Sequence, residues 1–160
     1  MTKSTGGATL LNVIEEPTAL DLKIARDHFI QEHLEPFWDD LVAAVKGTCE
    51  RLTAEWPNKH CEHDLNDHNS RIRVTHTPPR GAKSTVEIRF DRKKERLLET
   101  AEGTLWLPEA YIPAPDFDNN MLRFKPEKRK RTGDLREFSA VQLAQLVICT
   151  HLLKMELPEA

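Results

Sequence analysis

The stretch EEPTALDLKIARDHFIQEHLEPFWDDLVAAVKGTCERLTAEWP, residues 15–57, decides the first half of the fold. Its apolar residues recur at steps of three or four, which is the period of one face of an α-helix. Thr18 followed by Asp21 predicts an N-terminal capping box, and the final proline predicts the end of the helix. Because proline lacks a backbone N–H and crowds the preceding turn, Pro36 predicts a kinked long helix, or two helices that meet near Glu35. The periodic face comprises Ile30, Leu34, Trp38, Leu41, Val45, Cys49, Leu52 and Trp56.

After this helical stretch the period of the apolar residues changes to two. From Arg71 onward, apolar and polar residues alternate, as they do in strands with one buried face. Short connections between such segments favour antiparallel pairing. We therefore predict an antiparallel meander of about four or five strands. The candidate segments are 71–75, 84–90, 95–101, 104–107, 121–124 and 135–138.

The end of the chain predicts a second helix. Ser139 and Gln142 form a capping-box pattern, and the residues that follow are apolar on most faces. We therefore expect an α+β fold: the long N-terminal helix, the meander, and a C-terminal helix packed on the sheet. At 160 residues the chain has the length of about one domain. We predict a flexible N-terminal segment, 1–17, and a single α+β domain, 18–160.

Composition predicts a soluble globular protein, with 39% hydrophobic and 31% charged residues. No apolar run has the ~18 to 20 residues needed to span a bilayer, and the apolar segment near the N-terminus is too short for a secretory signal. The three cysteines are odd in number, far apart and form no Cys-x-x-Cys pair. This pattern argues against a disulfide framework and fits a reducing compartment. We expect a cytoplasmic protein with no membrane partner.

The segment NKHCEHDLNDHNS, residues 58–70, is rich in histidine and contains one cysteine. Cysteine thiolates and neutral imidazoles are the normal ligands of zinc. The usual arrangement of two tightly spaced ligand pairs is missing here. We therefore favour a polar loop between helix and sheet, and keep a zinc site in the loop 60–68 as an alternative. Its ligands would be Cys61, His63 and His68, and no other cofactor is predicted.

A basic run, KPEKRKR, occupies residues 125–131. Lysine and arginine neutralise phosphates, but a protein that binds single strands also needs stacking aromatic residues on the same surface. Only Phe124 is near, and the net charge of the chain is −3. A solvated hairpin loop is the favoured interpretation, and we do not expect nucleic acid as the main partner. The residues of the alternative, which binds nucleic acid or an acidic partner, are Lys125, Lys128, Arg129, Lys130 and Arg131.

The segment TLWLPEAYIPAPDF, residues 104–117, combines large apolar residues with three prolines. Because proline cannot donate to a sheet ladder, we expect the proline-rich part to stay out of the central sheet and to run extended over a surface. That surface is either the protein's own helices or a partner, since stiff aromatic segments lose little entropy on docking. The predicted partner-binding residues are Trp106, Tyr111, Ile112 and Phe117.

Common catalytic signatures are missing from the sequence. It contains no glycine-rich phosphate loop, Gly-x-Ser-x-Gly elbow or His-Glu-x-x-His pair. An active site built from distant Asp, Glu and His residues would leave no local signature, so the expectation of no enzyme rests on absent motifs alone. Our first hypothesis is a non-catalytic binding or protein-interaction module whose partner is another protein or a second copy of itself. Zinc binding and nucleic-acid binding are the alternatives.

Overall fold

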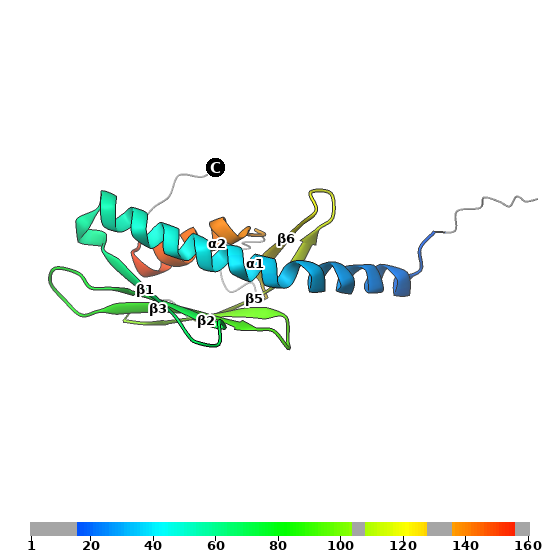
Figure 1. Cartoon of the computed structure of the whole chain (residues 1–160), viewed down its shortest axis with the longest axis horizontal. Coiled ribbons are helices and arrows are strands. Elements are labelled where there is room, and N and C mark those ends of the chain that lie inside the picture. Colours follow the sequence, from blue (N-terminus) through cyan, green and yellow to red (C-terminus); the bar gives the residue numbers. More distant parts are fainter. Residues whose placement is uncertain (1–15, 104–107, 128–135, 156–160) are drawn as a thin grey trace, which may run out of the picture.

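The structure is a computed structural model, and it describes residues 16–103, 108–127 and 136–155. It has two layers, an antiparallel sheet and a helical layer on one of its faces (Figure 1). This architecture confirms the α+β prediction. No helix in these ranges is both long and apolar enough to cross a membrane. In chain order the elements are α1 (Ala19–Glu55), η1 (Pro57–Lys59), β1 (Cys61–Leu65), β2 (Arg71–His76), β3 (Ser84–Asp91), β4 (Arg96–Glu102), β5 (Glu109–Asp116), β6 (Met121–Pro126), α2 (Ala140–Gln145) and η2 (Leu146–Leu152).

Helix α1 is a single helix of 37 residues. The predicted capping box is present, because the Asp21 N–H donates to Thr18 Oγ1 (3.1 Å) and the Thr18 N–H donates to Asp21 Oδ2 (3.0 Å). Of the two alternatives at Pro36, the single helix is confirmed. Pro36 and Glu32, the residue whose carbonyl loses its helical partner, are both exposed. Water can therefore take the place of the missing N–H, and the helix continues. Most of the predicted flexible segment 1–17 lies outside the described residues.

The sheet has six strands in the order β1-β2-β3-β4-β5-β6, each antiparallel to the next. One strand that the sequence did not predict is β1, and the interpretation of residues 60–68 as a polar loop was wrong. Cys61 and Leu65 turn toward the helices, whereas Glu62 and Asp64 are exposed on the other side. The charged side chains therefore lie on the solvent-facing side of β1. This strand is at the edge of the sheet and pairs with β2 along its whole length.

The proline-rich segment also contradicts its prediction, since it forms strand β5 inside the sheet. The Ala110 carbonyl accepts from the Glu127 N–H (2.8 Å), so the even-numbered residues of β5 direct their backbone groups toward β6. The odd-numbered residues direct theirs toward β4. The register between β4 and β5 ends at the pair Leu97–Tyr111. Pro113 and Pro115 therefore lie beyond this pairing, where a missing N–H breaks no ladder bond.

Helix α1 covers part of this free edge of β5. The Arg26 side chain donates from Nη2 to the Pro113 carbonyl (3.2 Å). This carbonyl belongs to the odd-numbered set, which points away from β6. The contact satisfies a backbone acceptor at the point where β4 no longer reaches, and it ties the N-terminal half of α1 to β5.

The last helical segment changes its winding midway. The predicted capping box of α2 is present, with the Gln142 N–H donating to Ser139 Oγ (3.2 Å) and the Ser139 N–H donating to Gln142 Oε1 (3.0 Å). After Gln145 the chain continues as the π-helical segment η2, in which the Leu153 N–H donates to the Ile148 carbonyl (3.0 Å). Helix α2 packs against α1, and η2 packs against β3, so both complete the core above the sheet.

Candidate functional site

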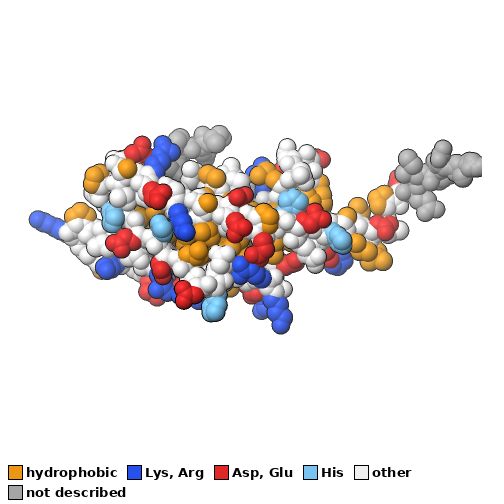
Figure 2. All heavy atoms as spheres, viewed as in Figure 1, with side chains coloured by type: hydrophobic (Ala, Val, Ile, Leu, Met, Phe, Trp, Pro, Cys, Tyr) orange, Lys and Arg blue, Asp and Glu red, His pale blue; other side chains and the backbone are white. Residues whose placement is uncertain are grey.

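The N-terminal end of α1 projects beyond the sheet (Figure 1). We call residues 19–29 the arm, of which Arg26 and Phe29 still contact β5 and the turn after it. Leu20, Leu22 and Ile24 are 65%, 58% and 51% exposed. Figure 2 shows hydrophobic side chains gathered on this projecting end. Steps of four and three residues lead from Leu20 and Ile24 to the buried Leu34, so both continue the face that packs on the sheet. The arm therefore carries core-type residues into solvent.

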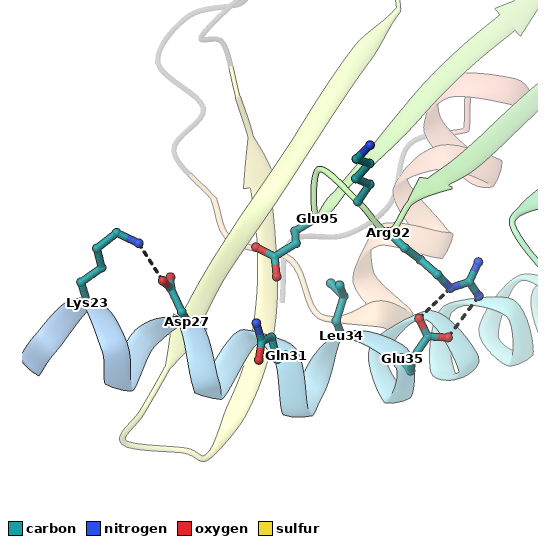
Figure 3. A pocket seen from close by; sticks show the side chains of 8 residues that line it. Lys23, Asp27, Gln31, Leu34, Glu35, Arg92 and Glu95 are labelled. Atoms are coloured by element: carbon teal, nitrogen blue, oxygen red, sulfur yellow. Dashed lines mark hydrogen bonds and ion pairs between the residues drawn. The ribbon is translucent and has the colours of Figure 1, made fainter.

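A groove lies between α1 and the turn that joins β3 to β4, and we call it the arm groove (Figure 3). Its volume is about 600 Å³. Three of its side chains are basic, three are acidic, and Leu34 is its apolar residue. The residues that line the arm groove are Lys23, Asp27, Gln31, Leu34, Glu35, Arg92, Lys93 and Glu95.

Arg92 fixes one wall of the arm groove (Figure 3). Its guanidinium donates to Glu35 through two bonds, Nε to Oε2 (2.7 Å) and Nη2 to Oε1 (3.1 Å). It also donates to the Asn69 carbonyl (2.9 Å) and lies 4.5 Å from the centre of the Phe90 ring. The hydrogen bond to Glu35 raises the pKa of Arg92 above its usual value. These contacts hold the turn between β3 and β4 against α1.

The opposite wall is formed by the arm itself. Lys23 Nζ donates to Asp27 Oδ2 at 2.6 Å, and both side chains are largely exposed. Because exposed pairs of this kind contribute little to stability, a partner can compete for either charge at small cost. The groove presents both signs of charge beside the apolar residues of the arm. This combination suits a polypeptide segment better than a simple anion or cation.

The structure places the four predicted partner-binding residues in different surroundings. Phe117 is 56% exposed after β5, and its ring centre lies 4.8 Å from that of Phe29 on the arm. Ile112 is half-buried in β5, and Tyr111 is buried. Trp106 lies outside the described residues. Of the residues described, Phe117 is therefore the one at the surface, and it borders the arm.

The three predicted zinc ligands are likewise separated by their exposure. Cys61 is buried in β1, His63 is half-buried on the same face of that strand, and His68 is exposed in the turn before β2. Across residues 16–103, 108–127 and 136–155, no group of three or more His, Cys, Asp or Glu side chains could hold a metal ion. Zinc binding stays a prediction, and elemental analysis of the untagged protein is its direct test.

The basic run is described at its first residues. Lys125 is half-buried in β6, opposite Ile112 of β5. Lys128, Arg129, Lys130 and Arg131 lie outside the described residues. Binding of nucleic acid or an acidic partner therefore also stays a prediction, which the salt dependence of oligonucleotide binding would test.

Three cysteines from different elements are buried as free thiols: Cys49 of α1, Cys61 of β1 and Cys149 of η2. Burial, together with the neighbouring thiols of Cys61 and Cys149, raises the pKa of Cys49 to about 12. Burial also raises the pKa of Cys61 to about 11. Since the thiolate is the reactive form, these thiols are protected from electrophiles.

We expect the folded protein to react very slowly with a disulfide reagent such as dithionitrobenzoate at pH 8. Each unit of raised pKa lowers the thiolate fraction tenfold, so Cys49 and Cys61 should react about 100-fold or more slower than an unstructured cysteine, and burial slows Cys149 as well. The same reagent added in concentrated urea should titrate all three cysteines within minutes. Rapid reaction of even one thiol in the folded protein would contradict this expectation.

A buried polar trio was not anticipated from the sequence. Glu99 of β4 is 1% exposed and accepts two hydrogen bonds, from Tyr111 Oη to Oε1 (2.6 Å) and from His151 Nδ1 to Oε2 (2.5 Å). The sequence did contain a sign of its burial. Side chains alternate between the two faces of β4, so Glu99 lies on the same face as the buried Leu97. An acidic residue on the buried face of a strand requires buried partners.

The trio and the arm differ in accessibility. Glu99, Tyr111 and His151 are at most 3% exposed, so these side chains serve the core, whereas the arm and its groove are open to a ligand. No protein-family model, curated protein or solved structure matches this chain, so its function is inferred from this geometry alone.

Proposed function

We propose that the protein is a non-catalytic interaction module that binds a polypeptide segment along its arm. One observation carries the proposal: two aliphatic residues of the arm, each more than half exposed, continue the core-facing side of α1 beside a groove of mixed charge. These two residues are Leu20 and Ile24. A partner segment with its own apolar residues would cover them while its polar groups meet the arm groove.

The helical state of the arm favours binding. An isolated helix as short as the arm is marginal in water, but the arm is the continuation of a 37-residue helix and has its own capping box. Its side chains are therefore held in place before a partner arrives. A preorganised surface loses less conformational entropy on binding than a disordered one.

The energetics predict a modest affinity. Fully burying one Leu or Ile side chain contributes about 1.5–3 kcal/mol, so covering the exposed parts of Leu20 and Ile24 contributes about 2–3 kcal/mol in total. Association itself costs at least about 4 kcal/mol in lost freedom. Further contacts in the arm groove must supply the remaining binding free energy. Lys93 and Glu95 line this groove and can bind polar groups of the partner. We expect weak binding, with dissociation constants no tighter than the micromolar range, because a value of 1 µM already requires about 8 kcal/mol of net binding free energy.

Selection from a phage-displayed library of helical peptides tests this function. We expect enriched peptides with two apolar residues one helical turn apart, flanked by charges. Their affinity should fall about 10- to 100-fold for the double variant Leu20→Gln, Ile24→Gln, because each 1.4 kcal/mol is a factor of ten. The measurement is isothermal titration calorimetry with the selected peptides.

The matched control is Leu22→Gln. Leu22 lies on the same arm with similar exposure but on another side of the helix, so this variant should keep the wild-type affinity. All these side chains are exposed, and glutamine is a good helix former, so the fold should not change. The proposal fails if no peptide is enriched, or if the double variant and the control bind the peptides equally well.

We also propose a cytoplasmic location. The free state of Cys49, Cys61 and Cys149 supports a reducing compartment. Fluorescence microscopy of a tagged chain would test it, and a signal confined to an oxidising compartment would contradict it.

A further inference from the structure

Strand β1 has one free edge. It pairs with β2 on one side, and in the part of the chain that the structure describes no strand pairs with its other side. The Asn66 N–H donates to the Arg71 carbonyl (3.0 Å), so the even-numbered residues of β1 direct their backbone groups toward β2. The odd-numbered residues direct theirs outward. Two of them, His63 and Leu65, are only half-buried, so their N–H groups and carbonyls can be reached at this edge.

A groove lies between this edge and the C-terminal part of α1, and we call it the edge groove. Its volume is about 530 Å³. It touches three consecutive residues of β1, 61–63, whose side chains alternate between the two faces of the sheet. A groove on one face would touch alternate residues only, so the edge groove runs along the backbone of the strand. On the α1 side it is lined by Cys49, Glu50, Thr53 and Ala54.

Other edges of the sheet are closed, whereas this one is open. The free part of β5 contains two prolines, and Arg26 occupies one of its carbonyls. At the outer edge of β6, Phe124 exchanges two backbone hydrogen bonds with Phe138 (2.9 and 2.7 Å). Strand β1 contains no proline, and the outward N–H groups of His63 and Leu65 have no acceptor among the residues described. An open edge of this kind accepts an extended chain as an additional strand.

The charges on β1 argue against a second copy as that chain. Glu62 and Asp64 are both exposed on the solvent-facing side of the strand. If two copies of β1 paired antiparallel about His63, Glu62 of one copy would lie opposite Asp64 of the other. Pairing in parallel and in register would place each carboxylate beside its own counterpart. Like charges that face each other across strands destabilise the pair, so the edge favours a basic partner.

The carboxylates of β1 are accessible to such a partner. Arg73, which lies opposite Asp64 on β2, donates to a glutamate of β3 instead (3.1 Å). Glu62 makes one long contact, 3.6 Å from His60 Nε2, and its side chain is 76% exposed. The edge groove adds the carboxylate of Glu50, and no Lys or Arg lines this groove. Basic side chains on a neighbouring strand would therefore form favourable cross-strand pairs.

We propose that β1 binds an extended polypeptide segment as an additional antiparallel strand, in which lysine or arginine alternates with small apolar residues. The basic side chains would face Glu62 and Asp64, and the apolar ones would turn toward α1, on the face where Cys61 and Leu65 lie. This site does not depend on the proposed function of the arm. Along α1, 33 residues separate its lining residue Thr53 from Leu20, a distance of about 50 Å.

Fluorescence anisotropy with a labelled peptide, Lys-Val-Lys-Val-Lys-Val-Lys, tests the proposal. We expect saturable binding that weakens as the salt concentration rises. The double variant Glu62→Lys, Asp64→Lys should lower the affinity about 10-fold or more, because two favourable cross-strand pairs become repulsive. The matched control makes the same change of charge at two exposed carboxylates away from β1, Glu32→Lys, Asp118→Lys, and should keep the wild-type affinity. Circular dichroism checks that both variants are folded.

Backbone pairing needs a separate measurement, since charges alone could attract the peptide. In an antiparallel pair the peptide's valines lie opposite His63 and Leu65 and exchange hydrogen bonds with them. N-methylation of the valines should therefore abolish binding, whereas N-methylation of the lysines should preserve it. Amide hydrogen exchange followed by NMR should slow by about 10-fold or more at both residues in the saturated complex, because their N–H groups gain acceptors.

Three results would overturn the proposal. The first is no binding of the peptide, and the second is equal affinity for the β1 variant and its control. The third is unchanged hydrogen exchange at His63 and Leu65 in the saturated complex. The arm variant Leu20→Gln, Ile24→Gln should bind this peptide as the wild type does. If it alone lost binding, the peptide would lie on the arm, and the edge of β1 would not be its site.

Discussion

Replacing Glu99 by alanine should lower the free energy of unfolding by about 3–5 kcal/mol, because it breaks two hydrogen bonds to a carboxylate inside the core. Tyr111 Oη and His151 Nδ1 both donate to this carboxylate inside the core. For a chain of this length, the loss corresponds to a melting temperature lower by about 10 °C. Urea unfolding monitored by circular dichroism gives the free energy, and calorimetry gives the temperature.

Two control variants separate the polar network from other effects of mutation. Tyr111→Phe removes one donor and keeps the ring, so we expect a smaller loss of about 1–2 kcal/mol. Glu102→Ala changes an exposed carboxylate of the same strand and should alter stability by less than about 0.5 kcal/mol. If Glu99→Ala were as mild as Glu102→Ala, the trio would contribute nothing to the core.

Raising the pH above 9 should destabilise the folded protein through its buried thiols. In the folded state the pKa of Cys49 is about 12 and that of Cys61 is about 11, against an ordinary value of 9.0 for a cysteine thiol. A raised folded pKa means that the unfolded state loses its proton first. The stabilising effect is therefore complete below pH 9 and is lost as the pH rises toward 11 and 12. At pH 11, Cys49 alone should account for about 2–3 kcal/mol.

Lysine and tyrosine side chains also titrate in this range, so the comparison must be made between variants. Cys49→Ala should be less stable than the wild type at pH 7, because the smaller side chain leaves a cavity. The difference between the two proteins should then shrink from pH 9 to pH 11. Urea unfolding at intervals of half a pH unit measures both curves. Parallel curves over the whole range would contradict the assignment to Cys49.

The sequence predicted the regular parts of this fold because their periods are unambiguous. Ile30, Leu34, Trp38 and their successors recur at helical spacing, and all but Trp56 are buried. The alternation from Arg71 onward gave strands β2, β3 and β4 with nearly correct ends. Capping boxes at Thr18 and Ser139 marked both helix starts, since they depend on local hydrogen bonds alone.

The two strands that were missed show where local signals fail. In β1, the acidic residues Glu62 and Asp64 and the surrounding histidines resemble a loop, and only pairing with β2 makes the segment a strand. In β5, Pro113 and Pro115 argue against a sheet until it is known that β4 ends its pairing before them. Both outcomes depend on the neighbouring strand, which no local period describes.

The candidate site was only partly accessible to sequence reasoning. Leu20 and Ile24 follow the same period as the buried residues of α1, and nothing in the local sequence marks where the sheet stops covering the helix. The arm groove joins Lys23 and Arg92, which are distant in sequence. The prediction did identify Phe117, which borders the arm. The other partner-binding residues were predicted because they are apolar. An apolar residue can equally belong to the core, as the buried Tyr111 does.

The placement of the two prolines has a consequence for aggregation. An open sheet edge offers unpaired N–H groups to any extended chain, and this is how intermolecular strand pairing and amyloid growth begin. Pro113 and Pro115 remove those donors from the free part of β5, and Arg26 occupies one of its carbonyls. Concentrated solutions of the protein are therefore protected from fibre formation through this edge.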